Sequence, residues 1–166
     1  VPCRGVDHMD FAPSGKYLIA TCEFSGDVVK VDLETRKVVG ALKLSEMAMP
    51  QDIRLSPDGR VFYVADMMAD GVYVIDGDKL ETVSFIPTGK GTHGLYPSRD
   101  AKVIYVSNRG EGTISLLDTS TRAITSKWVI PGGGSPDMGG VSTDGKVLWL
   151  SGRYHAEVYA IDTQDG

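Results

Sequence analysis

The stretch Tyr63-Val64-Ala65-Asp66 recurs in altered form along the whole chain, and its spacing decides the fold. With this stretch included, the chain carries four such tetrads at steps of 44, 42 and 44 residues. The other three are Ile19-Ala20-Thr21-Cys22, Tyr105-Val106-Ser107-Asn108 and Trp149-Leu150-Ser151-Gly152. A second anchor, an apolar residue followed by aspartate, recurs at the same steps, as Val31-Asp32, Ile75-Asp76, Leu117-Asp118 and Ile161-Asp162. Strand-rich repeats of about 40–50 residues are typical of β-propellers. The sequence therefore predicts an all-β protein with four propeller blades.

The second repeat shows how one blade is built. Alternating polar and apolar residues predict a half-buried strand over 51–55, and a continuous apolar run predicts a fully buried strand over 61–65. Runs rich in β-branched and aromatic residues predict third and fourth strands over 72–76 and 81–86. We therefore expect four-stranded antiparallel blades within a single domain, 1–166, with blade limits near 6–48, 49–90, 91–134 and 135–166.

The turn between the first two strands of each repeat has glycine in three copies, Gly15, Gly59 and Gly145. Glycine adopts a positive φ without steric cost, and such turns often require one. The third copy has Ala101 in this slot. That turn is therefore expected to be strained or to be of another type.

Composition and charge narrow the classes of protein. Of the 166 residues, 42% are hydrophobic and 23% are charged, which are ordinary values for a globular domain. The formal net charge of −5 leaves no basic stripe to neutralise phosphates, so we do not expect a nucleic acid partner. No run approaches the roughly 18 apolar residues of a membrane helix, so no membrane span is expected.

These repeats resemble the YVTN family of β-propeller repeat proteins. The resemblance is carried by Tyr63-Val64-Ala65-Asp66 and Tyr105-Val106-Ser107-Asn108, by the preceding Ser56-Pro57-Asp58-Gly59-Arg60 and by the following Val74-Ile75-Asp76. It implies the fold over the whole chain. It implies little about function, because propellers of this kind serve as binding platforms, as surface proteins and as cofactor-holding domains of enzymes.

The chain holds four repeats, whereas propellers of this kind usually close with seven or eight blades. The sequence ends after the third strand expected for the fourth blade, so the outer strand of that blade is not encoded. Open blades expose strand edges and apolar faces, which favours association. We expect either a half-propeller that pairs with a second copy into an eight-bladed ring, or a fragment of a longer protein that contains the remaining blades. Both are favoured over a compact four-bladed monomer.

The inner strands of the repeats place one polar column near the mouth of the central channel. Aligned without gaps, the four strands bring together Asp7, Gln51, His93 and Asp137. Oxygen and imidazole groups from successive blades suit a divalent metal ion or a polar small molecule. We therefore take His93, Asp137 and Asp7 as candidate metal ligands, with solvent-facing polar residues as the alternative.

Neighbouring residues extend this candidate site over the loop face, where the blade linkers and the loops between second and third strands lie. His8 and Asp52 follow the polar column, and His155 lies in a loop of the same face. Arg109 and Arg153 occupy equivalent loops and suit an anionic ligand or a peptide carboxylate. Met67 and Met68 follow the Tyr63 tetrad and suit an adaptable apolar contact, although solvated loops explain the same residues.

Catalytic motifs give no competing interpretation. The run Gly132-Gly133-Gly134 is not followed by a helix or by the Lys-Ser/Thr pair of a phosphate loop, and no Gly-x-Ser-x-Gly elbow occurs. We therefore expect a non-catalytic binding or scaffold module that presents its loop face to a protein, a peptide or a small ligand. The alternative is a metal- or cofactor-holding propeller domain of an extracytoplasmic oxidoreductase or other enzyme.

Cys3 and Cys22 are the two cysteines of the chain, and the expected topology places both on one face of the first blade. A disulfide between them is geometrically possible, and two separate thiols are the alternative. A disulfide would indicate an exported protein, so the expected location is extracytoplasmic: periplasmic, secreted or at the cell surface.

Overall fold

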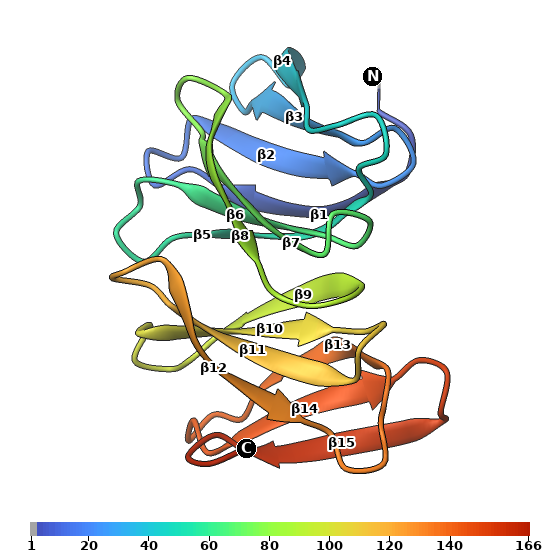
Figure 1. Ribbon diagram of the computed structural model, residues 1–166. Coiled ribbons are helices and arrows are strands. Elements are labelled where there is room, and N and C mark those ends of the chain that lie inside the picture. Colours follow the sequence, from blue (N-terminus) through green and yellow to red (C-terminus); the bar gives the residue numbers. More distant parts are fainter. Residues whose placement is uncertain (1–2) are drawn as a thin grey trace.

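The structure is a computed structural model that describes residues 3–166, and these residues form strands, turns and loops without any helix. None of them therefore provides a helix of the length and apolarity needed to cross a membrane. The strands form four antiparallel sheets that follow one another from the blue end to the red end of Figure 1. Each sheet contains consecutive strands, so each repeat of the sequence is one blade.

The first three sheets have four strands each, and the last has three within residues 3–166. The first sheet consists of β1 (Val6–Phe11), β2 (Tyr17–Cys22), β3 (Asp27–Asp32) and β4 (Lys37–Lys43). The second consists of β5 (Pro50–Leu55), β6 (Phe62–Asp66), β7 (Gly71–Asp76) and β8 (Glu81–Pro87). The third consists of β9 (Thr92–Pro97), β10 (Val103–Asn108), β11 (Thr113–Asp118) and β12 (Ala123–Val129). The fourth consists of β13 (Pro136–Val141), β14 (Val147–Gly152) and β15 (Glu157–Asp162). The expected propeller fold, with an incomplete last blade, is confirmed.

Apolar layers between consecutive blades form the core. Ile19, Val28, Ile53 and Phe62 belong to the layer between the first and second blades. The two further layers have the same construction; their central residues are Tyr63, Val74, Leu95 and Ile104 for the second and third blades, and Tyr96, Tyr105, Leu148 and Leu150 for the third and fourth. Each blade is thus stabilised by apolar burial against its neighbours, as in other repeat architectures.

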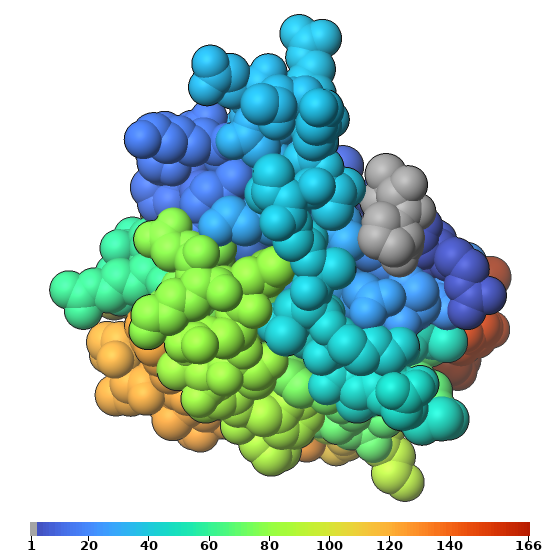
Figure 2. Space-filling view, turned by 90° about the horizontal axis from the view of Figure 1, so that it is seen from above, coloured from blue at the N-terminus to red at the C-terminus, as the bar shows by residue number. Residues whose placement is uncertain are grey.

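Within residues 3–166, the two end blades present faces that no further blade covers. On the fourth blade Trp149 is 47% exposed and Val158 is 70% exposed. On the first blade Met9 and Phe11 are exposed beside a layer that contains Leu18 and Val29. Seen from above, the first blade (blue and cyan) ends the stack, with the second blade (green) beside it (Figure 2). Large exposed apolar side chains on a sheet face are typical of an interaction surface.

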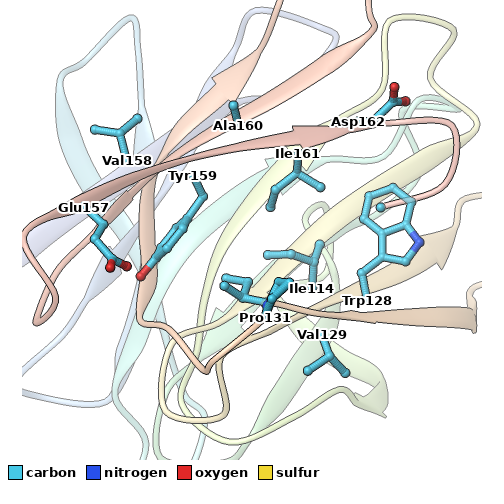
Figure 3. A pocket seen from close by; sticks show the side chains of 12 residues that line it. Ile114, Trp128, Val129, Pro131, Glu157, Val158, Tyr159, Ala160, Ile161 and Asp162 are labelled. Atoms are coloured by element: carbon cyan, nitrogen blue, oxygen red, sulfur yellow. The ribbon is translucent and has the colours of Figure 1, made fainter.

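A groove of about 430 Å³ lies beside the last strand, where the first three blades have their fourth strand. Figure 3 shows Ile114, Trp128 and Val129 on one side of the groove and Tyr159 and Ile161 on the other. The outer edge of β15 has no strand partner among residues 3–166. Unpaired edges of this kind invite pairing with another strand.

The inner strand of every blade contains an irregularity at the same place. The register between β1 and β2 shifts between Val6 and Met9, and equivalent shifts occur in the β5–β6, β9–β10 and β13–β14 pairs. A bulge inserts an unpaired residue and re-aims its side chain. These bulges carry the polar column predicted from the sequence.

Candidate functional site

Hydroxyl groups from the anchor tetrads support three of the four bulges. The Oγ1 atom of Thr21 accepts a hydrogen bond from the backbone N–H of His8 at 3.0 Å. In the third blade Ser107 accepts from Gly94 at 2.9 Å, and in the fourth Ser151 accepts from Met138 at 3.2 Å. Each hydroxyl satisfies a backbone donor that the bulge removes from the strand ladder, which explains why the third tetrad position carries Ser or Thr in these three blades, whereas the second blade has Ala65.

The carboxylate of Asp137 is the centre of the polar contacts at the mouth. Its Oδ1 atom accepts a hydrogen bond from Nη1 of Arg109 at 2.9 Å, and its Oδ2 atom accepts one from Nη1 of Arg153 at 3.2 Å. The Nε2 atom of His93 lies 3.2 Å from Oδ1. The third and fourth blades are thereby joined at the loop face through one carboxylate and two guanidinium groups. This arrangement brings together four residues predicted from the sequence.

Burial and charge set the protonation states of this cluster. His93 and Asp137 are 5% and 4% exposed. Burial, followed by the charge of Arg109, lowers the pKa of His93 to about 4, against an opposing effect of Asp137. Burial opposes ionisation of Asp137, but the nearby His93 and the hydrogen bonds from Arg109 and Arg153 outweigh it and lower its pKa. At neutral pH the cluster therefore holds a neutral imidazole, a carboxylate and two guanidinium cations.

Arg109 and Arg153 differ in their access to solvent. The Arg109 side chain is 8% exposed, and its Nη2 atom lies 2.6 Å from the sulfur of Met67 in the second blade. The Arg153 side chain is 55% exposed, and the neighbouring Tyr154 is 70% exposed. The Tyr154 ring centroid lies 5.8 Å from the Arg109 guanidinium carbon, within the range of a cation–π contact. The buried arginine thus links three blades, and the exposed arginine faces the solvent.

Ser135 orders the loop that carries Arg153. Its hydroxyl accepts a hydrogen bond from the backbone N–H of Tyr154 at 2.8 Å and lies 3.0 Å from Nδ1 of His155. Its own backbone N–H donates to the hydroxyl of Tyr159 at 3.2 Å. Ser135 is 1% exposed, so these contacts anchor the exposed loop to a buried residue. His155 takes part in this support and not in the Asp137 cluster.

The remaining predicted residues of the polar column and its neighbours lie in the first and second blades, and Asp52 also contacts the third blade. Nδ1 of His8 lies 3.3 Å from the Asp7 carboxylate. Asp52 pairs with Arg54 at 2.9 Å and accepts a hydrogen bond from the backbone N–H of Leu95 at 2.9 Å. Burial raises the pKa of Asp52 despite the charge of Arg54.

Gln51 donates a side-chain hydrogen bond to the carbonyl of Met49 at 3.1 Å. In residues 3–166 no three His, Cys, Asp or Glu side chains are placed to share a metal ion. Asp7, His93 and Asp137 therefore do not form a three-residue metal cluster here, and the contacts of Asp137 are with His93 and the two arginines.

The sequence did not identify two residues that contribute to the site, Ser135 and Tyr154, because their residue types carry no functional signal of their own. Ser135 follows the glycine run of a blade linker, and Tyr154 is one aromatic residue in an exposed loop. Their common signal is position, since both belong to segments that the repeat spacing places on the loop face.

Cys3 and Cys22 form a disulfide, with their Cα atoms 5.3 Å apart, as the topology allowed.

Comparisons with known proteins agree with this architecture. Antigen Lp49 of Leptospira interrogans serogroup Icterohaemorrhagiae serovar copenhageni (strain Fiocruz L1-130) is 28% identical over 139 residues, which cover 78% of this chain and 29% of that protein. A chain of the Kuenenia stuttgartiensis hydrazine synthase is 26% identical with a TM-score of 0.82, over 98% of this chain and 47% of that one. The chain thus spans under a third of the antigen and about half of the hydrazine synthase chain.

The family assignment rests on almost the whole chain. Residues 3–165 match the family described as the YNCE-like beta-propeller. The match includes all four blades and therefore every residue of the Asp137 cluster. The chain belongs to the YNCE-like beta-propeller family.

Proposed function

We propose that this chain is a non-catalytic binding module that presents its loop face to a protein, a peptide or a small ligand. The observation that carries the proposal is the Asp137 cluster, in which rigid strands of two blades hold an exposed arginine beside an exposed tyrosine. Binding residues are often found on loops that a rigid scaffold positions. Exposed Arg and Tyr side chains are also enriched in binding hot spots.

A photo-crosslinking comparison tests the proposal. A photoreactive amino acid replaces Tyr154 on the loop face, and in a matched protein it replaces Ser120, in a turn that follows β11 on the opposite face. We expect specific adducts in an extract of the producing cell from position 154, and we expect Arg153→Ala to abolish them. Equal adduct yields from both positions would show that the loop face is not a preferred surface.

Extracytoplasmic location is part of the proposal, and the Cys3–Cys22 disulfide supports it. Disulfides persist in oxidising compartments and are rare in the cytosol. Mass spectrometry of the native protein, alkylated before lysis, tests this point. Protection of both cysteines supports export, and full alkylation contradicts it.

We further propose that the uncovered faces of the first and fourth blades pair with other blades, either in a second copy or in the rest of a longer protein. Both faces are apolar, because one presents Trp149 and Val158 and the other presents Met9 and Phe11. The three internal blade interfaces bury equivalent apolar layers. Association would complete the central channel around the inner strands.

A second candidate function is a metal- or cofactor-holding domain of an extracytoplasmic oxidoreductase. The Nδ1 atom of His93 is buried without a hydrogen-bond partner among residues 3–166, which favours it. If Nε2–H donates to Asp137, the free lone pair lies on Nδ1, as in many metal-binding histidines. The similarity to a hydrazine synthase chain also supports it.

Titration with Zn²⁺ and Co²⁺ followed by calorimetry tests this candidate. Stoichiometric binding that His93→Ala abolishes supports it. Unchanged binding in that variant contradicts a metal site at His93.

A further inference from the structure

The Asp137 cluster carries an excess of positive charge. Arg109 and Arg153 both pair with Asp137, and among residues 3–166 neither forms an ion pair with a second carboxylate. His93, the other titratable group in contact with Asp137, is neutral at pH 7 because burial lowers its pKa to about 4. Within the cluster two guanidinium cations therefore share one carboxylate anion, and the Asp7 carboxylate nearby contacts His8 instead. A partly desolvated site with this imbalance favours an additional anion.

The hydrogen-bonding capacity of the cluster is also unequal. Each guanidinium group has several N–H donors and no acceptor. Nη2 of Arg109 faces the thioether sulfur of Met67, which is a weak acceptor. Arg153 makes one hydrogen bond to a carboxylate, through Nη1. Most of its donors are therefore available to a second carboxylate.

Exposure determines where a ligand can approach. Arg109 is buried, whereas Arg153 and Tyr154 are exposed side by side on the β14–β15 loop. Asp137 fixes the Arg153 guanidinium from the protein side, and Ser135 holds the backbone of Tyr154. A pre-oriented guanidinium loses less side-chain entropy when it binds a planar carboxylate. The adjacent phenol ring offers an apolar surface.

We propose that Arg153, positioned by Asp137 and Arg109 and flanked by Tyr154, binds the carboxylate of an acid that carries an adjacent aromatic or aliphatic group. This inference rests on the proposed loop-face binding function and names its ligand class. The carboxylate pairs with the free edge of Arg153, and the apolar group packs on Tyr154. Arg109 acts as a positioning residue, because it is buried and reaches the ligand only through Asp137.

Matched small probes test the ligand class. N-acetylphenylalanine and its uncharged amide have the same shape, and each is titrated into the isotopically labelled protein while backbone NMR shifts are recorded. We expect saturable shifts at residues 152–157 with the acid. The amide should bind at least about tenfold more weakly than the acid. Added salt should weaken binding of the acid only.

Three variants locate the interaction. Arg153→Ala should abolish the preference for the acid, and Arg153→Lys should recover part of it, because lysine keeps the charge and loses the planar fork. Arg60→Ala is the matched control, since Arg60 is an 80% exposed arginine in a turn on the opposite face. Equal binding of acid and amide, or an equal loss in Arg60→Ala, would overturn the proposal.

A third probe distinguishes the source of the carboxylate. Binding of 3-phenylpropionate as tight as that of N-acetylphenylalanine supports the proposal for free organic acids. Binding of the acetylated amino acid alone supports it for a peptide C-terminus. If crosslinking at position 154 succeeds but neither acid binds better than its amide, the loop-face function stands and the carboxylate assignment is wrong.

Discussion

Ala101 has a φ of 60°, close to the values of Gly15, Gly59 and Gly145 in the equivalent turns. The sequence left open whether this turn is strained or of another type. The equivalent φ values show that the turn is kept and that alanine takes the left-handed conformation. A side chain in that region costs about 1–2 kcal/mol relative to the right-handed one.

Ala101→Gly should therefore raise the free energy of unfolding by about 1 kcal/mol, because glycine relieves the strain but loses more chain entropy. Urea denaturation measures the change. Gly15→Ala is the matched control, since its added Cβ would meet no heavy atom within 4 Å, and it should destabilise by a similar amount. Effects of the same sign in both variants would refute the strain argument.

The hydroxyl of Ser107 is buried and accepts a hydrogen bond from the backbone N–H of Gly94 at the bulge of the third blade. Ser107→Ala should lower the free energy of unfolding by about 1–3 kcal/mol, because it leaves that donor without an acceptor. Ser151 makes the equivalent contact at an exposed position, where water can replace the hydroxyl. Ser151→Ala should have a much smaller effect in the same denaturation experiment, and equal losses would contradict the role of burial.

The stability of the fold should depend on pH through His93. The pKa of His93 is about 4 in the folded chain and near 6.5 in the unfolded chain, so folding favours the neutral ring. Its stabilising effect is complete above pH 6.5 and is lost as the pH falls toward 4. We expect a loss of about 2–3 kcal/mol between pH 7 and pH 4.5.

Comparison with His93→Gln separates this effect from the titration of carboxylates, including Asp52 with its raised pKa and Asp137 with its lowered one. The variant should show a flatter dependence of the free energy of unfolding on pH over the same interval. A slope identical to that of the parent protein would exclude His93 as the titrating group.

At the scale of single elements, the strands were largely predictable. In the second blade the expected strands 51–55, 61–65, 72–76 and 81–86 differ from β5 to β8 by one residue at most at either end. Periodicity and turn residues are local signals, and both agree in every repeat. The bulges were not predicted, because they depend on how two strands pair and not on the composition of either.

The candidate site was predictable only in part for the same reason. The repeat alignment placed His93 and Asp137 in one column and Arg109 and Arg153 in equivalent loops. It did not show that one carboxylate would bind both arginines, since this depends on how the third blade packs on the fourth. The alignment also grouped Asp7 with His93 and Asp137, whereas Asp7 pairs with His8 in its own strand.

The Cys3–Cys22 disulfide joins the segment before β1 to the end of β2, with a sequence separation of 19 residues. Closing a loop of that size restricts the unfolded chain and stabilises the fold by about 3 kcal/mol. The Cys3→Ser/Cys22→Ser double variant should lose about that amount, as measured by urea denaturation. An equal decrease in the free energy of unfolding of the parent protein after treatment with reductant would support this. No decrease in either the variant or the reduced parent protein would contradict it.

At the scale of the whole molecule, the uncovered end faces predict association. Light scattering after size exclusion should give an average mass that rises toward twice 17.8 kDa as the protein concentration increases, because the dimer fraction grows by mass action. Trp149→Asp places a charge in the exposed face of the fourth blade and should shift the population to the monomer. Lys146→Asp, in the turn before β14, is the control. A monomer at all concentrations for the parent protein would leave only the blades of a longer protein as partners for these faces.

The repetition of one bulge in every inner strand also has a consequence for how such a protein diversifies. A bulged residue lies outside the strand ladder, so its side chain can be exchanged while the surrounding pairing is kept. The side chains at the four equivalent positions 7, 51, 93 and 137 can therefore vary while the blades keep the same backbone. Duplication of a blade would add one such position, and substitution there would change the chemistry of the channel mouth while the pairing of the strands is kept.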